Sequence, residues 1–174
     1  MVNSKQFPAF SSVAVANDLV RRARECGQRD LSANKLHDLV YIAHGWHLGL
    51  TGHPLLLDRP MANVDGVFLP DLREAGCWGA RRIDESIAEV VLDEARGVMV
   101  EVAPNIPERA PVRAVIARIW ALWGGVSSYD LRNFTREVGA PWDLIWNDED
   151  RPDDEPQSLP SGTVRLWFRD YVES

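Results

Sequence analysis

Cysteine is scarce in this sequence of 174 residues, with only Cys26 and Cys77. Two such cysteines form neither a disulfide framework nor a zinc-ligand pattern, so both are predicted to be reduced, structural thiols. No apolar run approaches the roughly 20 residues that a membrane span needs. The N-terminus lacks the apolar core of a signal peptide. We therefore expect a cytoplasmic protein with no membrane partner.

The motifs of common catalytic and nucleotide-binding sites are also missing. The sequence has no Gly-x-x-x-x-Gly-Lys-Ser/Thr or Gly-x-Gly-x-x-Gly phosphate loop, no Gly-x-Ser-x-Gly nucleophile elbow and no His-Glu-x-x-His zinc pattern. We expect no enzyme activity, no cofactor and no bound metal. One alternative stays open, in which His44 and His47 share a metal or Cys77 pairs with a histidine in a thiol enzyme.

Positive charge is also scarce. The sequence has 19 basic and 26 acidic side chains, so its formal net charge is −7. Such a surface repels phosphate backbones, so nucleic acid is not an expected partner. The one basic cluster, Arg21, Arg22, Arg24 and Arg29, has no adjacent aromatic platform and is predicted to be a solvated helix face. The acidic balance suits a basic protein partner.

The length of 174 residues suits one domain, which is predicted over residues 1–174. Ser11 or Ser12 and Gly27 bound the first predicted helix, and Ser32 and Gly52 bound the second. Further helices are predicted over 111–124, 127–139, 141–146 and 163–172, with Val138 on the inner face of the second of these four. The β-branched runs 89–92 and 98–102 flank Gly97 and predict a β-hairpin. The predicted fold class is mainly α, a compact domain of about six helices with one small β-hairpin.

The second predicted helix is apolar on nearly all sides, which is typical of a buried helix. Gly45 and Gly49 each lower the stability of this helix by about 1 kcal/mol relative to Ala. Because these glycines lie four residues apart, we expect them to let another backbone approach closely.

Two segments are candidate partner surfaces. The segment Gly-Cys-Trp-Gly-Ala-Arg-Arg places Trp78 near Arg81 and Arg82, a composition typical of interface hot spots. The alternative is that Trp78 folds back onto the core. Residues 148–160 form an acidic, Pro-containing loop, which either attracts a partner or only keeps the loop solvated. The acidic candidates in that loop are Asp148, Glu149, Asp150, Asp153 and Asp154.

An ordered set of short motifs runs through most of the chain. Residues 15–17 read Val-Ala-Asn, residues 43–46 read Ala-His-Gly-Trp, and residues 50–52 read Leu-Thr-Gly. This set resembles the Panacea domain, found in bacterial and phage-associated proteins. The matching positions that we expect to be structural are Lys35, Leu36, Tyr41, His44, Gly45, Trp46, Gly52, Pro54, Thr135, Pro141 and Trp142.

The resemblance implies a non-enzymatic antitoxin or immunity-type protein, which neutralises a cognate toxin encoded nearby by direct binding. One branch of the family resembles proteolytic adaptors, so a protease is a second implied partner. A regulatory protein linked to phage or secretion genes is a further alternative. None of these roles needs a catalytic residue.

Overall fold

We describe the fold from a computed structural model, which covers residues 7–29, 31–151 and 154–173, without the side chain of residue 173. The helices are α1 (Ser12–Glu25), α2 (Ala33–Thr51), α3 (Pro70–Glu74), α4 (Val112–Trp123), α5 (Ser128–Thr135), α6 (Pro141–Trp146) and α7 (Ser161–Glu173). The strands are β1 (Met61–Asn63), β2 (Gly66–Phe68), β3 (Glu89–Asp93), β4 (Val98–Val102) and β5 (Gln157–Ser158).

The fold class is mixed α/β, so the prediction of a mainly α domain with one hairpin is wrong. The described residues are 47% helix and 13% strand, with seven helices and two small sheets. The second sheet has the strand order β2-β1-β5 and brings residues 157–158 of the predicted acidic loop against β1. Its strands are two or three residues long, too short to show the alternation by which a strand is recognised in sequence.

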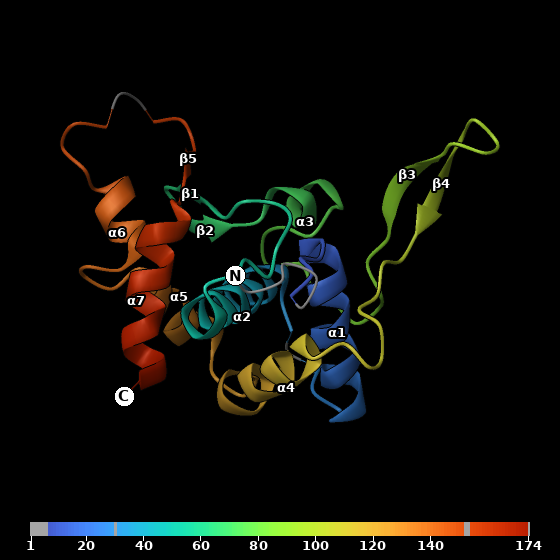
Figure 1. The fold of residues 1–174 in the computed structure, drawn as a ribbon, viewed down its shortest axis with the longest axis horizontal. Helices are drawn as coiled ribbons and strands as arrows, with labels where there is room; N and C mark the ends of the chain where they lie inside the picture. Colours follow the sequence, from blue (N-terminus) through green and yellow to red (C-terminus); the bar gives the residue numbers. More distant parts are fainter. Residues whose placement is uncertain (1–6, 30, 152–153, 174) are drawn as a thin grey trace.

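Helix α2 is the central element and packs against α1, α4, α5, α7 and β2 (Figure 1). Ser32 caps its N-terminus by accepting from the backbone N–H of Lys35 at 3.2 Å. Gly52 ends it in the left-handed conformation at φ 73°. Both predicted boundaries are therefore confirmed. Across the described residues, none of the helices is long and apolar enough to cross a membrane.

The two glycines of α2 face α7. A Cβ on Gly49 would lie 3.0 Å from the backbone nitrogen of Arg169, so the predicted close backbone approach is confirmed there. A Cβ on Gly45 would overlap the ring of Phe168, which is 1% exposed. The absence of side chains at Gly45 and Gly49 therefore lets α2 and α7 pack closely together.

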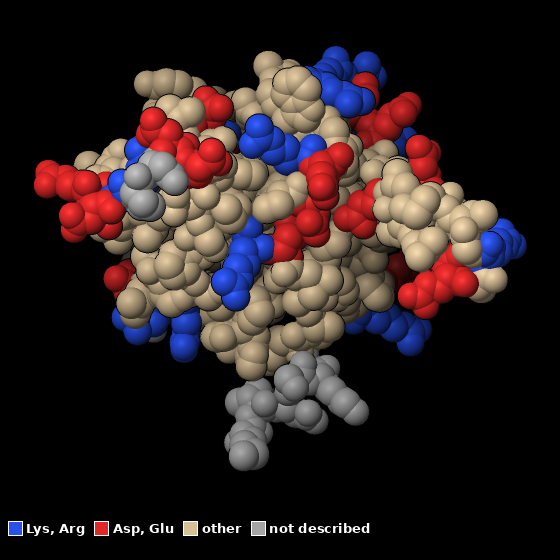
Figure 2. Space-filling model, turned by 90° about the horizontal axis from the view of Figure 1, so that it is seen from above, with Lys and Arg blue, Asp and Glu red and all other residues tan. Residues whose placement is uncertain are grey.

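The β3–β4 hairpin is confirmed and projects away from the helices (Figure 1). Gly97 adopts φ 65° in its turn, a conformation that favours glycine. The strands contact mainly each other. Figure 2 shows the hairpin as a projection with few charges except toward its tip.

Asn17, which is 3% exposed, holds both ends of this hairpin. Its Nδ2 donates to the carbonyl oxygens of Ile87 and Pro104, each at 2.9 Å. Its Oδ1 accepts from the backbone N–H of Ile87 at 2.8 Å. One buried side chain of α1 therefore joins the chain segments before β3 and after β4. We call this arrangement the Asn17 clamp.

Candidate protein-binding groove

Trp78 lies on the surface, with 66% of its area exposed, and does not fold back onto the core. It borders two adjoining hollows of about 540 and about 480 Å³, which share Phe68, Arg73 and Trp78. We call them together the Trp78 groove. Its other lining residues are Asn34, His37, Asn63, Asp65, Val67, Pro70, Glu74, Gly79 and Arg132.

The loop that carries Trp78 is fixed by the start of α2. The first N–H groups of a helix have no partner within the helix. Here the N–H of Ala33 donates to the carbonyl oxygen of Arg81 at 2.7 Å, and that of Asn34 donates to Gly79 at 3.1 Å. These bonds satisfy the helix end and hold the backbone that follows Trp78.

His37 of α2 fixes the loop from its other side. The backbone N–H of Leu69 donates to Nδ1 of His37 at 3.0 Å, so Nε2 carries the proton that is donated to the carbonyl oxygen of Cys77 at 2.7 Å. Burial lowers the pKa of His37 from 6.5 to about 4, so the ring is neutral at pH 7. His37 therefore joins α2 to the residue next to Trp78.

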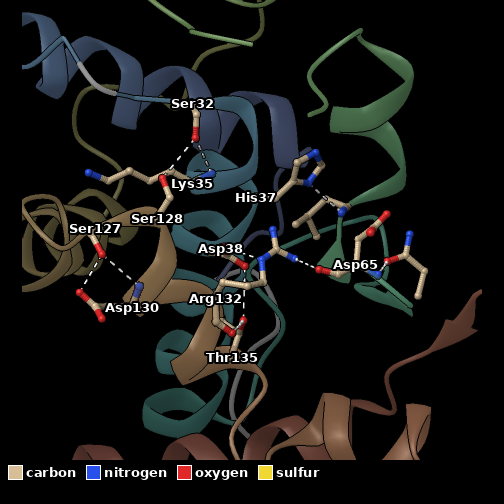
Figure 3. A network of polar contacts seen from close by, with 12 residues as sticks. Ser32, Lys35, His37, Asp38, Asp65, Ser127, Ser128, Asp130, Arg132 and Thr135 are labelled. Carbon is tan, nitrogen blue, oxygen red and sulfur yellow. Dashed lines mark hydrogen bonds and ion pairs between the residues drawn. The ribbon is translucent and has the colours of Figure 1, made fainter. Parts of the chain in front are cut away.

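Arg132 of α5 lines the groove and contacts the buried carboxylate of Asp38 (Figure 3). Its Nε lies 3.2 Å from Oδ2 of Asp38, and its Nη1 donates to the carbonyl oxygen of Asp65 at 2.7 Å. Thr135 donates to Oδ1 of Asp38 at 3.4 Å. Gly66, at φ 126°, leaves room for the guanidinium, which a Cβ there would overlap. The cation is thereby fixed in place.

The contact between Arg132 and Asp38 is an ion pair without hydrogen-bond geometry, and within the described residues Oδ2 has no directed donor. Burial raises the pKa of Asp38 to about 7, against the attraction of Arg132. Arg132 is therefore paired with a buried carboxyl group to which it makes no directed hydrogen bond.

The groove combines an aromatic anchor with two cations, of which Arg132 is held by Asp38 and Asp65. The guanidinium of Arg73 lies 5.0 Å from the centre of the Phe68 ring, a cation–π contact beside Trp78. Trp and Arg are the side chains enriched in interface hot spots. This arrangement can bind a protein segment that supplies apolar and acidic groups.

The predicted surface residues do not all meet at this groove. Arg81 and Arg82 are exposed, but they line a separate hollow of about 310 Å³ with Asp84 and Glu85. The acidic run lies beyond α6, on the far side of the molecule from the β3–β4 hairpin (Figure 1). Its described acidic candidates, Asp148, Glu149, Asp150 and Asp154, are exposed, whereas Asp153 lies outside the described residues.

Sequence reasoning missed Phe68, Arg73 and Arg132. They come from β2, α3 and α5, and only the folded chain places them beside Trp78. None belongs to a local motif, so no sequence pattern pointed to them. The one available signal was Gly66, the first residue of β2, since glycine in a strand can mark a site where another group approaches closely.

The residues of the metal and thiol alternative are engaged in other contacts. Nδ1 of His44 accepts from the N–H of Leu56 at 3.4 Å, and Nδ1 of His47 donates to the carbonyl oxygen of His53 at 2.9 Å. Burial raises the pKa of Cys77 to about 12, which disfavours a reactive thiolate. No group of three His, Cys, Asp or Glu residues in the described part of the chain could hold a metal.

Most positions of the Panacea-like motifs lie inside the protein. The buried positions are Lys35, Leu36, Tyr41, His44, Gly45, Thr135, Pro141 and Trp142. Trp46 and Gly52 are partly buried, and Pro54 is exposed. Trp142 donates from Nε1 to the carbonyl oxygen of Asn63 at 2.9 Å, which ties α6 to β1. A structural role for these positions stays a prediction.

Comparisons with protein-family models, with curated proteins and with solved structures find no match for this chain. The resemblance to the Panacea domain therefore depends on the motif residues themselves. Any function inferred from it is a proposal.

We expect the stability of the protein to rise between pH 4 and pH 6.5. Burial lowers the pKa of both His37 and His44 from 6.5 to about 4, so the unfolded chain binds two protons there that the folded protein does not. The raised pKa of Asp38 acts in the opposite direction, because the folded protein keeps a proton that the unfolded chain loses above 3.8. From these three groups the unfolded state binds one proton more, so stability should rise by about 1.4 kcal/mol per pH unit. The lowered pKa of His47 adds to this slope, and the raised pKa of Asp71 subtracts from it. Urea unfolding at a series of pH values measures this slope.

The Asp38→Asn variant is the matched control for this slope. Removing the opposing group should raise the slope to about 2.7 kcal/mol per pH unit. An unchanged slope would mean that Arg132 keeps Asp38 ionised throughout this pH range.

Proposed function

We propose that this chain is a binding protein of the antitoxin type, which neutralises a toxin protein by direct contact through the Trp78 groove. The observation that carries the proposal is Trp78 itself, a largely exposed tryptophan on a loop held by His37 and by the start of α2. A rigid aromatic anchor loses little conformational freedom when it binds, so it favours tight association.

The surroundings of Trp78 favour a protein partner over a small substrate. The groove is open, and two cations, Arg73 and Arg132, flank an aromatic surface. The motif resemblance to the Panacea domain adds the expectation that this partner is a toxin encoded nearby.

Co-expression with each neighbouring open reading frame tests the proposal. A toxic neighbour should lose its toxicity and copurify with this chain. A toxin that loses its effect while its level falls would indicate the proteolytic-adaptor alternative. Absence of growth rescue with every neighbour would refute the antitoxin proposal.

Substitution of Trp78 by Ala should weaken toxin binding by about a hundredfold, since hot-spot truncations cost about 2–4 kcal/mol. The free energy of unfolding should change by less than about 0.5 kcal/mol, because the side chain is mostly exposed. Titration calorimetry with the purified toxin and a urea melt measure the two quantities.

Tyr129→Ala is the matched control, because Tyr129 is 75% exposed and lines neither hollow of the Trp78 groove. Equal binding by both variants and the unmodified chain would place the toxin on another surface.

A further inference from the structure

The β3–β4 hairpin exposes apolar side chains on both of its faces. The register pairs Leu92 with Met99 on one face and Val91 with Val100 on the other. Leu92 is 56% exposed, Met99 62% and Val90 61%. A lone two-stranded hairpin is marginally stable in water, and exposed apolar patches mark interaction sites. Within the described residues the two strands have their main contacts with each other, so these apolar side chains stay exposed.

The direction of the hairpin is fixed at its base. The Asn17 clamp holds the segments before β3 and after β4. Ser11, the N-cap of α1, donates from Oγ to Oε1 of Glu89 in β3 at 2.7 Å. The hairpin is therefore a positioned arm, with two unpaired strand edges that can each accept a further strand.

An acidic cleft of about 560 Å³ lies between the base of this arm and α3. Four carboxylates line it, from Asp71 and Glu74 of α3 and from Glu89 and Glu101 of the hairpin. None of the described residues that line it is Lys or Arg. Burial and the negative charges of Asp58, Glu89 and Glu74 raise the pKa of Asp71. Figure 2 shows acidic side chains gathered between the hairpin and the body of the molecule.

We propose that the β3–β4 hairpin and the acidic cleft at its base bind an extended, basic segment of a partner protein, which adds to the hairpin as a strand. Strand addition uses main-chain hydrogen bonds for affinity and alternate side chains for specificity. Here apolar side chains of the segment cover Leu92 and Met99, and its Lys or Arg side chains enter the cleft.

Charge complementarity selects this occupant over a second copy of the chain. The chain carries a net charge of −7, so pairing of two copies through their hairpins would bring two acidic molecules together. Like charges across an interface disfavour association. The surface touches the Trp78 groove only at Glu74, so this inference goes beyond the proposed function and can fail or succeed independently of it.

The test titrates the full-length chain with an eight-residue peptide of alternating valine and lysine, and with a matched peptide of alternating valine and glutamate. We expect the lysine peptide to bind and the glutamate peptide not to bind. Binding should weaken as salt rises from about 0.02 to about 0.3 M, because salt screens exposed charges. Equal binding of the two peptides, or no binding of the lysine peptide, would overturn the proposal.

Four variants separate the surfaces. The double variant Leu92→Ser/Met99→Ser should weaken lysine-peptide binding by at least about tenfold, and Glu89→Gln/Glu101→Gln should weaken it and flatten its salt dependence. Trp78→Ala should bind the peptide normally, as should Val138→Ser, which alters a valine that is 92% exposed elsewhere. Unchanged binding by Leu92→Ser/Met99→Ser would exclude the hairpin. A dimer of the unmodified chain in sedimentation that this double variant abolishes would assign the hairpin to a second copy instead.

Discussion

Replacing Gly45 by Ala should lower the free energy of unfolding by about 2 kcal/mol. Helix propensity alone predicts the opposite, a gain of about 1 kcal/mol. The added methyl group would overlap the ring of Phe168, which is 1% exposed in the α2–α7 contact. Phe168 is held edge-to-face against Tyr41 and Phe134, so the ring has little room to move. Overpacking of this kind costs about 3 kcal/mol at the upper end of its usual range, and the propensity gain of about 1 kcal/mol offsets part of that cost. Urea unfolding measures the change.

Gly162→Ala is the control, because Gly162 also lies in a helix, α7, and a Cβ there would meet no atom within 4 Å. This variant should be as stable as the unmodified protein or slightly more stable. The double variant Gly45→Ala/Phe168→Leu should lose less than the sum of its two single changes, since the smaller side chain gives the methyl group room. Full additivity would mean that the two residues do not compete for one space.

Replacing Asn17 by Ala should cost about 2–4 kcal/mol and loosen the hairpin. The variant loses the bonds from Nδ2 to Ile87 and Pro104 and leaves the N–H of Ile87 without its acceptor. A buried polar group without its partner costs about 1–3 kcal/mol. Backbone amides of residues 89–102 should exchange with deuterium faster than in the unmodified chain, because the segments before β3 and after β4 are no longer held. Unfolding and hydrogen exchange on the same sample measure both effects.

Asn105→Ala makes the same chemical change at an exposed site, where Nδ2 bonds only the carbonyl oxygen of Ala103. It should alter stability by less than about 0.5 kcal/mol. If the Asn17 variant behaves like this control, the contact of Ser11 with Glu89 is enough to hold the arm.

Helix boundaries could be predicted from the sequence because they depend on local chemistry. Ser11, Ser32 and Ser127 cap α1, α2 and α5 as expected. The prediction was wrong for the C-terminal end of α5. The helix expected to continue to Gly139 ends at Thr135, and Val138, expected on its inner face, is 92% exposed.

The candidate groove was only partly predictable. The composition of the loop around Trp78 left an exposed anchor and a core residue as alternatives, and the exposed side chain agrees with the first. Arg73 and Arg132 could not be predicted, because they reach the groove through the packing of α3 and α5 around α2. The prediction that Arg81 and Arg82 share one surface with Trp78 did not anticipate their separate hollow.

The Asn17 clamp would allow the β3–β4 hairpin to be exchanged for another hairpin. Its hydrogen bonds go to main-chain atoms of Ile87 and Pro104, so they specify the two attachment points and not the side chains between them. The arm contacts mainly itself, so a hairpin of different sequence could be grafted between these points without repacking the helices. A hairpin of another sequence between the same two attachment points would present a different binding surface on an unchanged helical scaffold.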